Sequence, residues 1–151
     1  MSEEQLWSNA RRWHRQAAND REAAEALVAA EKYAQASFLA QQAAEKAMKA
    51  VWIALDCDPW GHSITRLIKD LPAPEQDPFD ALREAALSLD KLYIPTRYPD
   101  ALAGLIPAEA YTRSEAVQAC EHAATFVDRV GTWLDAHTGE EGEEGSGTQR
   151  A

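Results

Sequence analysis

"QQAAEKAMKAVW", residues 41–52, combines an apolar face with a polar edge at the spacing of an α-helix. The apolar face consists of Ala43, Ala47, Ala50 and Val51. The polar edge beside it consists of Gln42, Glu45 and Lys49. We predict a helix from about Tyr33 to Asp56, which ends before the helix-breaking run at residues 58–61. The polar edge faces water, a ligand or a partner chain, and which of these it faces bears directly on function.

Local signals at helix ends place the other helices. Ser2-x-x-Gln5 and Thr112-x-x-Glu115 have the form of a capping box, so they predict a long first helix and a long last helix. Between them we expect a short helix over residues 63–71 and another that begins at Asp77-Pro78 and ends near Tyr93. No stretch alternates apolar and polar residues as a strand does. The predicted fold is therefore all-α, an up-down bundle of four to five helices.

Two segments stand outside this helical pattern. Residues 94–112 lack helical periodicity and contain three prolines, but their apolar residues Leu102, Leu105 and Ile106 lead us to expect a long loop that packs in an ordered way. Residues 138–151 are rich in glycine and glutamate and nearly free of apolar residues, which predicts a disordered acidic tail. We therefore predict one helical domain over residues 1–137, followed by the tail.

The last helix carries two apolar stripes, whereas one stripe is enough to pack a helix into a bundle. One stripe consists of Val117, Cys120, Ala124, Val127, Gly131 and Leu134. The other consists of Ala119, Ala123, Phe126, Val130 and Trp133. The second stripe suits either a wide core or a dimer contact, because large aromatic patches on a surface mark interfaces. We predict a homodimer that buries Phe126 and Trp133.

The composition is that of a globular protein, with 46% hydrophobic residues, 26% charged residues and a net charge of −10. We expect a cytoplasmic location and no membrane association, since no segment resembles a signal peptide or a membrane span. The negative charge argues against a dedicated DNA-binding domain. Arg11, Arg12, His14 and Arg15 form a basic cluster, which a solvated helix face explains. We expect Cys57 and Cys120 to be inert packing residues.

Motifs of common enzyme classes are absent from the sequence, including the phosphate loop, the dinucleotide-binding glycines and the zinc-protease motif. No two of the four histidines have helical metal-ligand spacing, so we expect no metal site, and we expect no cofactor. Residues 89–101, LDKLYIPTRYPDA, place two tyrosines and Arg97 at a helix exit. Either Arg97 holds a phosphate and the tyrosines stack on a base, or Arg97 pairs with Asp90 or Asp100 and the tyrosines pack the loop.

Three motifs together resemble the HEPN domain family, a nucleotide-binding domain of higher eukaryotes and prokaryotes. They are Gln42-x-x-Glu45-Lys46-x-x-Lys49, then Gly61-His62-Ser63-Ile64, then Leu89-Asp90-x-x-Tyr93-Ile94-x-x-Arg97-Tyr98-Pro99. The resemblance covers most of residues 5–135, with the motifs in the order typical of the family. It implies an all-α bundle that usually dimerises. It also implies a minimal nucleotidyltransferase as partner, in a toxin–antitoxin-like pair.

The resemblance implies a ligand site on the polar edge of the second predicted helix. The implied ligand-binding residues are Gln42, Glu45, Lys49, His62, Arg97 and Tyr98. Many family members are metal-independent endoribonucleases with an arginine followed, after four to six residues, by a histidine. No arginine in this sequence has a histidine at that spacing. We therefore expect binding of a nucleotide or nucleic acid and no catalysis, with a ribonuclease that uses Arg97, His62 and Tyr98 as the alternative.

Overall fold

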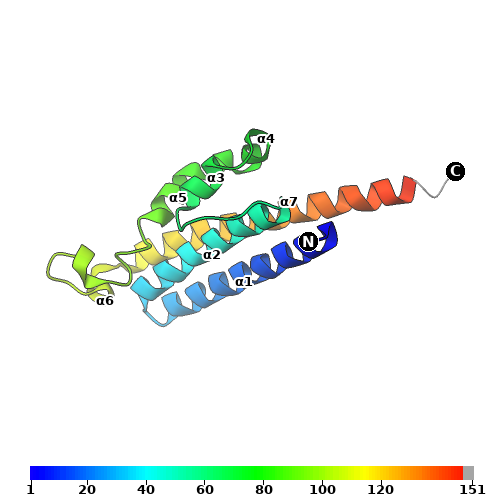
Figure 1. Ribbon diagram of the computed structural model, residues 1–151. Coiled ribbons are helices and arrows are strands. Elements are labelled where there is room, and N and C mark those ends of the chain that lie inside the picture. Colours follow the sequence, from blue (N-terminus) through cyan, green and yellow to red (C-terminus); the bar gives the residue numbers. More distant parts are fainter. Residues whose placement is uncertain (148–151) are drawn as a thin grey trace.

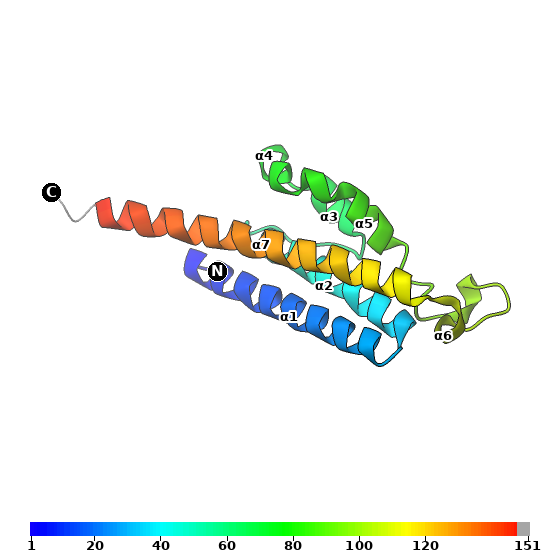
Figure 2. The same cartoon turned by 180° about the vertical axis from the view of Figure 1, so that it is seen from behind.

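The computed structural model describes residues 1–147, with side-chain surroundings described for residues 1–137. Three long helices, α1 (Glu3–Ala29), α2 (Tyr33–Ala54) and α7 (Arg113–Gly147), lie side by side (Figures 1 and 2). In Figure 1, α1 runs opposite to α2 and α7. No strand occurs within residues 1–147. The predicted all-α fold is confirmed.

Both predicted capping boxes are formed. The Ser2 hydroxyl accepts from the Gln5 amide at 3.2 Å, and the Gln5 side chain accepts from the Ser2 amide at 3.0 Å. At the start of α7, the Thr112 hydroxyl accepts from the Glu115 amide at 3.2 Å, and the Glu115 carboxylate accepts from the Thr112 amide at 3.3 Å. These bonds satisfy amides that a helix leaves unpaired at its first turn, which fixes where α1 and α7 begin.

Alanines form the seam along which α1 packs on α2. On α1, Ala10, Ala17 and Ala24 recur every seven residues and are fully buried. On α2, the fully buried alanines are Ala36, Ala40, Ala43, Ala44, Ala47 and Ala50. Because alanine has only a methyl group, the two helix backbones approach each other closely along this seam.

Four short helical segments form a second layer over α2 and α7 (Figure 1). They are α3 (Ile64–Lys69), α4 (Ala73–Gln76), the 3₁₀ segment η1 (Asp77–Leu82) and α5 (Arg83–Asp90). The helix predicted to start at Asp77-Pro78 begins as a 3₁₀ turn and becomes α-helical only at Arg83. The indole nitrogen of Trp52 donates to the Leu67 carbonyl at 2.8 Å and thereby ties α3 to α2.

Asp90, at the end of α5, holds the start of α3. Its carboxylate accepts from the Ile64 amide at 2.6 Å, the Thr65 amide at 3.1 Å and the Ser63 hydroxyl at 3.0 Å. A carboxylate at this place also interacts favourably with the positive end of the helix dipole. The loop between α2 and α3 is therefore fixed at its far end by a residue that is 26 positions away from Ile64 in sequence.

The aromatic stripe of α7 is part of the core of the chain itself. Phe126 is fully buried and Trp133 is only 6% exposed in the isolated chain. The Trp133 ring stacks on Trp7, with centroids 5.8 Å apart, and lies 6.5 Å from the ring of Phe79. The prediction that Phe126 and Trp133 form a dimer contact is therefore wrong, because α1 and η1 already cover this stripe.

The connection between α5 and α7 contains η2 (Pro99–Ala101) and the single turn α6 (Pro107–Ala110). It extends from one end of the bundle (Figure 1). Leu105 and Ile106 are 44% and 52% exposed, so the prediction of packing is wrong for these two residues, whereas Leu102 is half-buried and α6 contacts α2, as expected of a loop that packs in an ordered way.

α7 continues as a helix to Gly147, past the predicted end of the bundle at His137. Glutamate is a good helix former, which is consistent with a helix here in spite of the glycines. Residues 148–151, the rest of the predicted disordered tail, lie outside the described residues. None of the described helices has the length and hydropathy needed to cross a membrane.

Cys120 is buried on α7. Burial raises the pKa of its thiol to about 11, with a further contribution from Glu25. Because the thiolate is the reactive form, this cysteine is a poor nucleophile near neutral pH.

Candidate functional site

Glu45 is the centre of the polar edge of α2. Its side chain is only 5% exposed, although it is a carboxylate on a helix whose buried residues are mostly apolar. One oxygen lies 3.0 Å from Nδ1 of His62, and the other lies 3.7 Å from Nζ of Lys49. A buried carboxylate needs such partners, because an unpaired buried charge is strongly destabilising.

The loop after α2 brings His62 to Glu45. Gly61 adopts φ 77, a left-handed conformation that residues other than glycine rarely adopt, and it turns the chain just before His62. The buried side chain of Gln41 donates to the His62 carbonyl at 3.2 Å, and Gln42 donates to the Gln41 side chain at 2.7 Å. Both the backbone and the ring of His62 are thus held by α2.

The orientation of the His62 ring leaves its second nitrogen, Nε2, able to bond a ligand or to transfer a proton. Since a carboxylate only accepts, Nδ1 carries a proton and donates it to Glu45. The His62 side chain is 55% exposed, and its ring stacks on Tyr93 at 4.6 Å between centroids. A histidine that is oriented by a carboxylate in this way presents Nε2 to a bound molecule.

Arg97 lies among three aromatic rings. Its guanidinium carbon is 4.3 Å from the ring centroid of Tyr93, 4.6 Å from that of Phe38 and 5.0 Å from that of Tyr98. Its Nε donates to the Tyr93 carbonyl at 2.8 Å. Among the side chains described, Arg97 makes no ion pair with a carboxylate. The guanidinium is therefore oriented by stacking and keeps its terminal N–H groups for an anion.

The structure connects the six residues predicted to form the site. Glu45 contacts Lys49 and His62, and Gln42 reaches His62 through Gln41. Tyr93 links His62 to Arg97, and Tyr98 lies on Arg97. We call this group the Glu45–Arg97 cluster: Gln42, Glu45, Lys49, His62, Arg97 and Tyr98, together with Phe38, Gln41 and Tyr93. That the cluster binds a ligand stays a prediction.

The alternative prediction for Arg97 was an ion pair with Asp90 or Asp100. Asp90 instead bonds the first amides of α3, as described above. Lys49 is not in open solvent either, since its side chain is only 13% exposed. The polar edge of α2 therefore faces other polar groups of the same chain, and only its outer members reach the surface.

Two residues of the cluster, Phe38 and Gln41, were missed at the sequence level. Tyr93 was predicted either to stack on a base or to pack the loop, but it was not among the six implied ligand-binding residues. Gln41 and Tyr93 each had a signal in the sequence. Gln41 precedes Glu45 by four residues, so the two lie on one helix face, and Tyr93 precedes Arg97 by the same interval. Phe38 gave no comparable signal, because its place beside Arg97 depends on how the loop after α5 returns to α2.

Two of the remaining histidines have structural partners. His14 Nε2 lies 2.8 Å from the Val127 carbonyl, and His137 Nδ1 lies 2.8 Å from the Trp133 carbonyl. Gly131 permits the first contact, since a side-chain carbon at this position would lie 3.2 Å from the His14 ring. The His14 contact joins α1 to α7, and the His137 contact lies within α7. Neither histidine is part of the cluster.

Comparisons with known proteins agree with this architecture. The model of the HEPN domain family matches residues 10–133. The crystal structure of TT1696 from Thermus thermophilus is similar at 44% identity and a TM-score of 0.78, over 82% of this chain and 96% of that one. No curated protein matches the chain.

Two further crystal structures are similar. ST0689, an archaeal HEPN homologue, has 33% identity and a TM-score of 0.69, over 83% of this chain and 97% of that one. An HEPN domain protein from Thermotoga maritima has 30% identity and a TM-score of 0.65, over 82% of this chain and 98% of that one. With the family model covering the bundle from α1 to α7, we conclude that the chain belongs to the HEPN domain family.

Proposed function

We propose that the protein is a nucleotide-binding interaction module and that the Glu45–Arg97 cluster is its binding site. The observation that carries the proposal is the arrangement of Arg97, a cation that is stacked on three aromatic rings and has no carboxylate partner among the described side chains. The guanidinium supplies a fork for phosphate, and Tyr98, which is 50% exposed, supplies a ring for stacking on a base.

We further propose that the protein works as a homodimer beside a minimal nucleotidyltransferase, in a toxin–antitoxin-like pair. This part of the proposal is supported by membership of the HEPN domain family. A reading frame for a small nucleotidyltransferase next to that of this protein would support the pairing.

Replacing Arg97 with alanine should weaken the binding of nucleoside mono- and diphosphates by about 10- to 100-fold. Hydrogen bonds to a charged group contribute about 1.5–3 kcal/mol, and one factor of ten is about 1.4 kcal/mol. Isothermal titration at low salt measures this difference, because the net charge of −10 makes anion binding weaker and more dependent on salt.

Arg66→Ala is the matched control for this titration. Arg66 lies on the surface of α3, 3.6 Å from Asp70, and its loss changes the net charge by the same amount. We expect this variant to bind within about twofold of the wild type. Equal binding by all three proteins would show that the cluster is a structural feature only.

One observation favours the endoribonuclease as a second candidate function. His62 is oriented by Glu45 and its side chain is 55% exposed, which suits a general acid or base. Arg97, linked to His62 through Tyr93, would hold the phosphate. Proton transfer by a histidine and phosphate binding by an arginine are the two roles that a metal-independent ribonuclease needs.

We expect no cleavage of RNA above background when chelator is present, since the spacing of arginine and histidine that the family's ribonucleases use is absent. Gel analysis of a labelled RNA incubated with wild type, His62→Ala and His122→Ala tests this expectation. General acid–base catalysis contributes about 10²- to 10⁴-fold, so a role for His62 would be easily detected. Cleavage that persists in His122→Ala and is lost in His62→Ala would establish the ribonuclease instead.

A further inference from the structure

The first half of α1 differs in charge from the rest of the chain. The protein has a net charge of −10, yet residues 5–19 contain three arginines and one histidine and no acidic residue. At 1.5 Å per residue, this stretch of helix is about 21 Å long. The charges of the chain are thus segregated, and the whole acid-free stretch lies on α1.

Two of the arginines in this stretch have no partner in the described part of the chain. Arg11 pairs with Asp135 at 3.3 Å, and Arg21, just beyond the stretch, pairs with Glu25 and Asp128. Arg12 and Arg15, in contrast, make neither a hydrogen bond nor an ion pair with any described side chain or backbone group. Both are therefore available to an anion.

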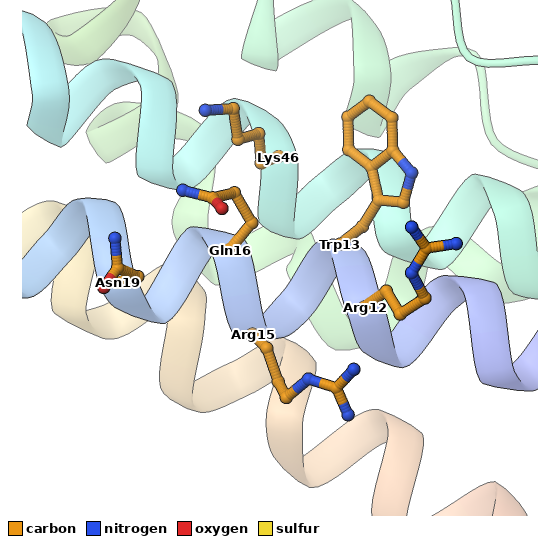
Figure 3. Close-up of a pocket in the computed structure, with 6 residues that line it drawn as sticks. All are labelled: Arg12, Trp13, Arg15, Gln16, Asn19 and Lys46. Carbon is orange, nitrogen blue, oxygen red and sulfur yellow. The ribbon is translucent and has the colours of Figure 1, made fainter.

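These two arginines line a hollow of about 540 Å³ between α1 and α2. Figure 3 labels the six residues that line it: Arg12, Trp13, Arg15, Gln16, Asn19 and Lys46. Gln16 and Lys46 both bond Asp20, at 2.8 Å and 2.5 Å, so the carboxylate next to the hollow is already neutralised. A second hollow of about 760 Å³ adjoins the first at Arg12 and continues along α1 past Asn9, Ser8 and Gln5, with Glu4 at its far end.

We propose that the α1–α2 hollow binds the phosphates of single-stranded nucleic acid. Arg12 and Arg15 contact successive phosphates, the side-chain amides of Gln16 and Asn19 donate to phosphate or base oxygens, and the half-buried indole of Trp13 packs against a base. This site shares no residue with the Glu45–Arg97 cluster and goes beyond the proposed nucleotide site.

The shape of the surface favours the binding of a nucleic-acid strand over the binding of a single phosphate group. Two hollows that meet at Arg12 make one continuous path along α1, which is longer than one nucleotide. A duplex carries twice the phosphate density, and the negative field of the remaining chain opposes it more strongly. A membrane surface would need several exposed apolar anchors beside the cations, whereas the apolar residues that line the two hollows are Met1, at the end of the second hollow, and the half-buried Trp13.

Fluorescence anisotropy with labelled 15-residue oligouridine and oligothymidine tests the proposal on the full-length chain at about 50 mM salt. We expect the wild type to bind and the Arg12→Ala/Arg15→Ala variant to bind at least about tenfold more weakly. The slope of log affinity against log salt should fall by about 1.4, since each phosphate contact on a single strand contributes about 0.7. Binding of either oligomer that the Arg12→Ala/Arg15→Ala variant weakens supports the proposal, and the ratio of the two affinities tells which sugar is preferred.

The matched control is Arg66→Ala/Arg113→Ala, which removes the same charge from exposed sites outside both hollows. It should bind within about twofold of wild type. Thermal melting of both double variants should match the wild type, because all four side chains lie at the surface or make only surface pairs.

Three results would overturn the proposal. One is equal weakening by the two double variants, which would mean that only net charge matters. Another is binding of uridine monophosphate as tight as that of the oligomer, which would mean a single phosphate site. The third is binding to vesicles that contain an anionic lipid with no binding to either oligomer. Trp13→Phe adds an independent readout, since quenching of tryptophan emission by the oligomer should decrease in this variant.

Discussion

We expect Phe126→Asp to unfold the protein and not to release folded monomers from a dimer. Phe126 is fully buried within the chain itself. Removing a buried phenylalanine side chain costs about 3–5 kcal/mol, and an unpaired buried charge adds to this loss. Since a domain of this kind is stable by only about 5–15 kcal/mol, the folded state should be lost or nearly lost.

Circular dichroism and light scattering, measured together, distinguish the two outcomes. Leu87→Asp is the control, because Leu87 is 52% exposed on α5 and a change there should alter the free energy of unfolding by about 0.5 kcal/mol or less. A Phe126→Asp protein that is monomeric and melts at the wild-type temperature would show that the stripe is a contact between subunits after all. Light scattering of the wild type at the same time tests the proposed homodimer.

The second large effect is expected at Asp90. Asp90→Ala removes three hydrogen bonds at the start of α3, and we expect a loss of about 2–3 kcal/mol in the free energy of unfolding. Chemical denaturation measures this loss. Asp90→Asn, which keeps an acceptor oxygen, should lose less than the alanine variant.

Asp100→Ala is the control for Asp90, since Asp100 is exposed in the loop after α5. Its unfolding should match that of the wild type. If Asp90→Ala unfolded at the same denaturant concentration as Asp100→Ala, the three bonds would have no net stabilising effect and α3 would be held by its apolar contacts alone.

Features that depend on neighbouring residues were predictable from the sequence. The capping boxes at Ser2 and Thr112 need only residues within one helical turn, and both form as predicted. The helical spacing of Gln42, Glu45 and Lys49 correctly placed them on one edge of α2. In each case the pattern and the contact lie within the same short segment.

Contacts between segments that are far apart in the sequence were not predictable from local patterns. The stripe with Phe126 was predicted to suit either a wide core or a dimer contact, because nothing in α7 indicates that Trp7 and Phe79 reach it. The role of Asp90 is similar, since α4 and η1 lie between α3, which holds its partners, and the end of α5. The family resemblance, and not spacing alone, brought His62 and Arg97 into one predicted site.

The alanine seam between α1 and α2 has a consequence for how stability changes with temperature. About half of the buried hydrophobic residues are alanine, so this core removes less apolar surface from water per residue than a leucine-rich core does. The heat-capacity change of unfolding grows with the apolar area exposed, and it determines the curvature of the stability curve. A bundle held together by close backbone approach should therefore have a flatter curve, and lose stability more gradually on cooling and on warming, than a leucine-rich bundle of equal length.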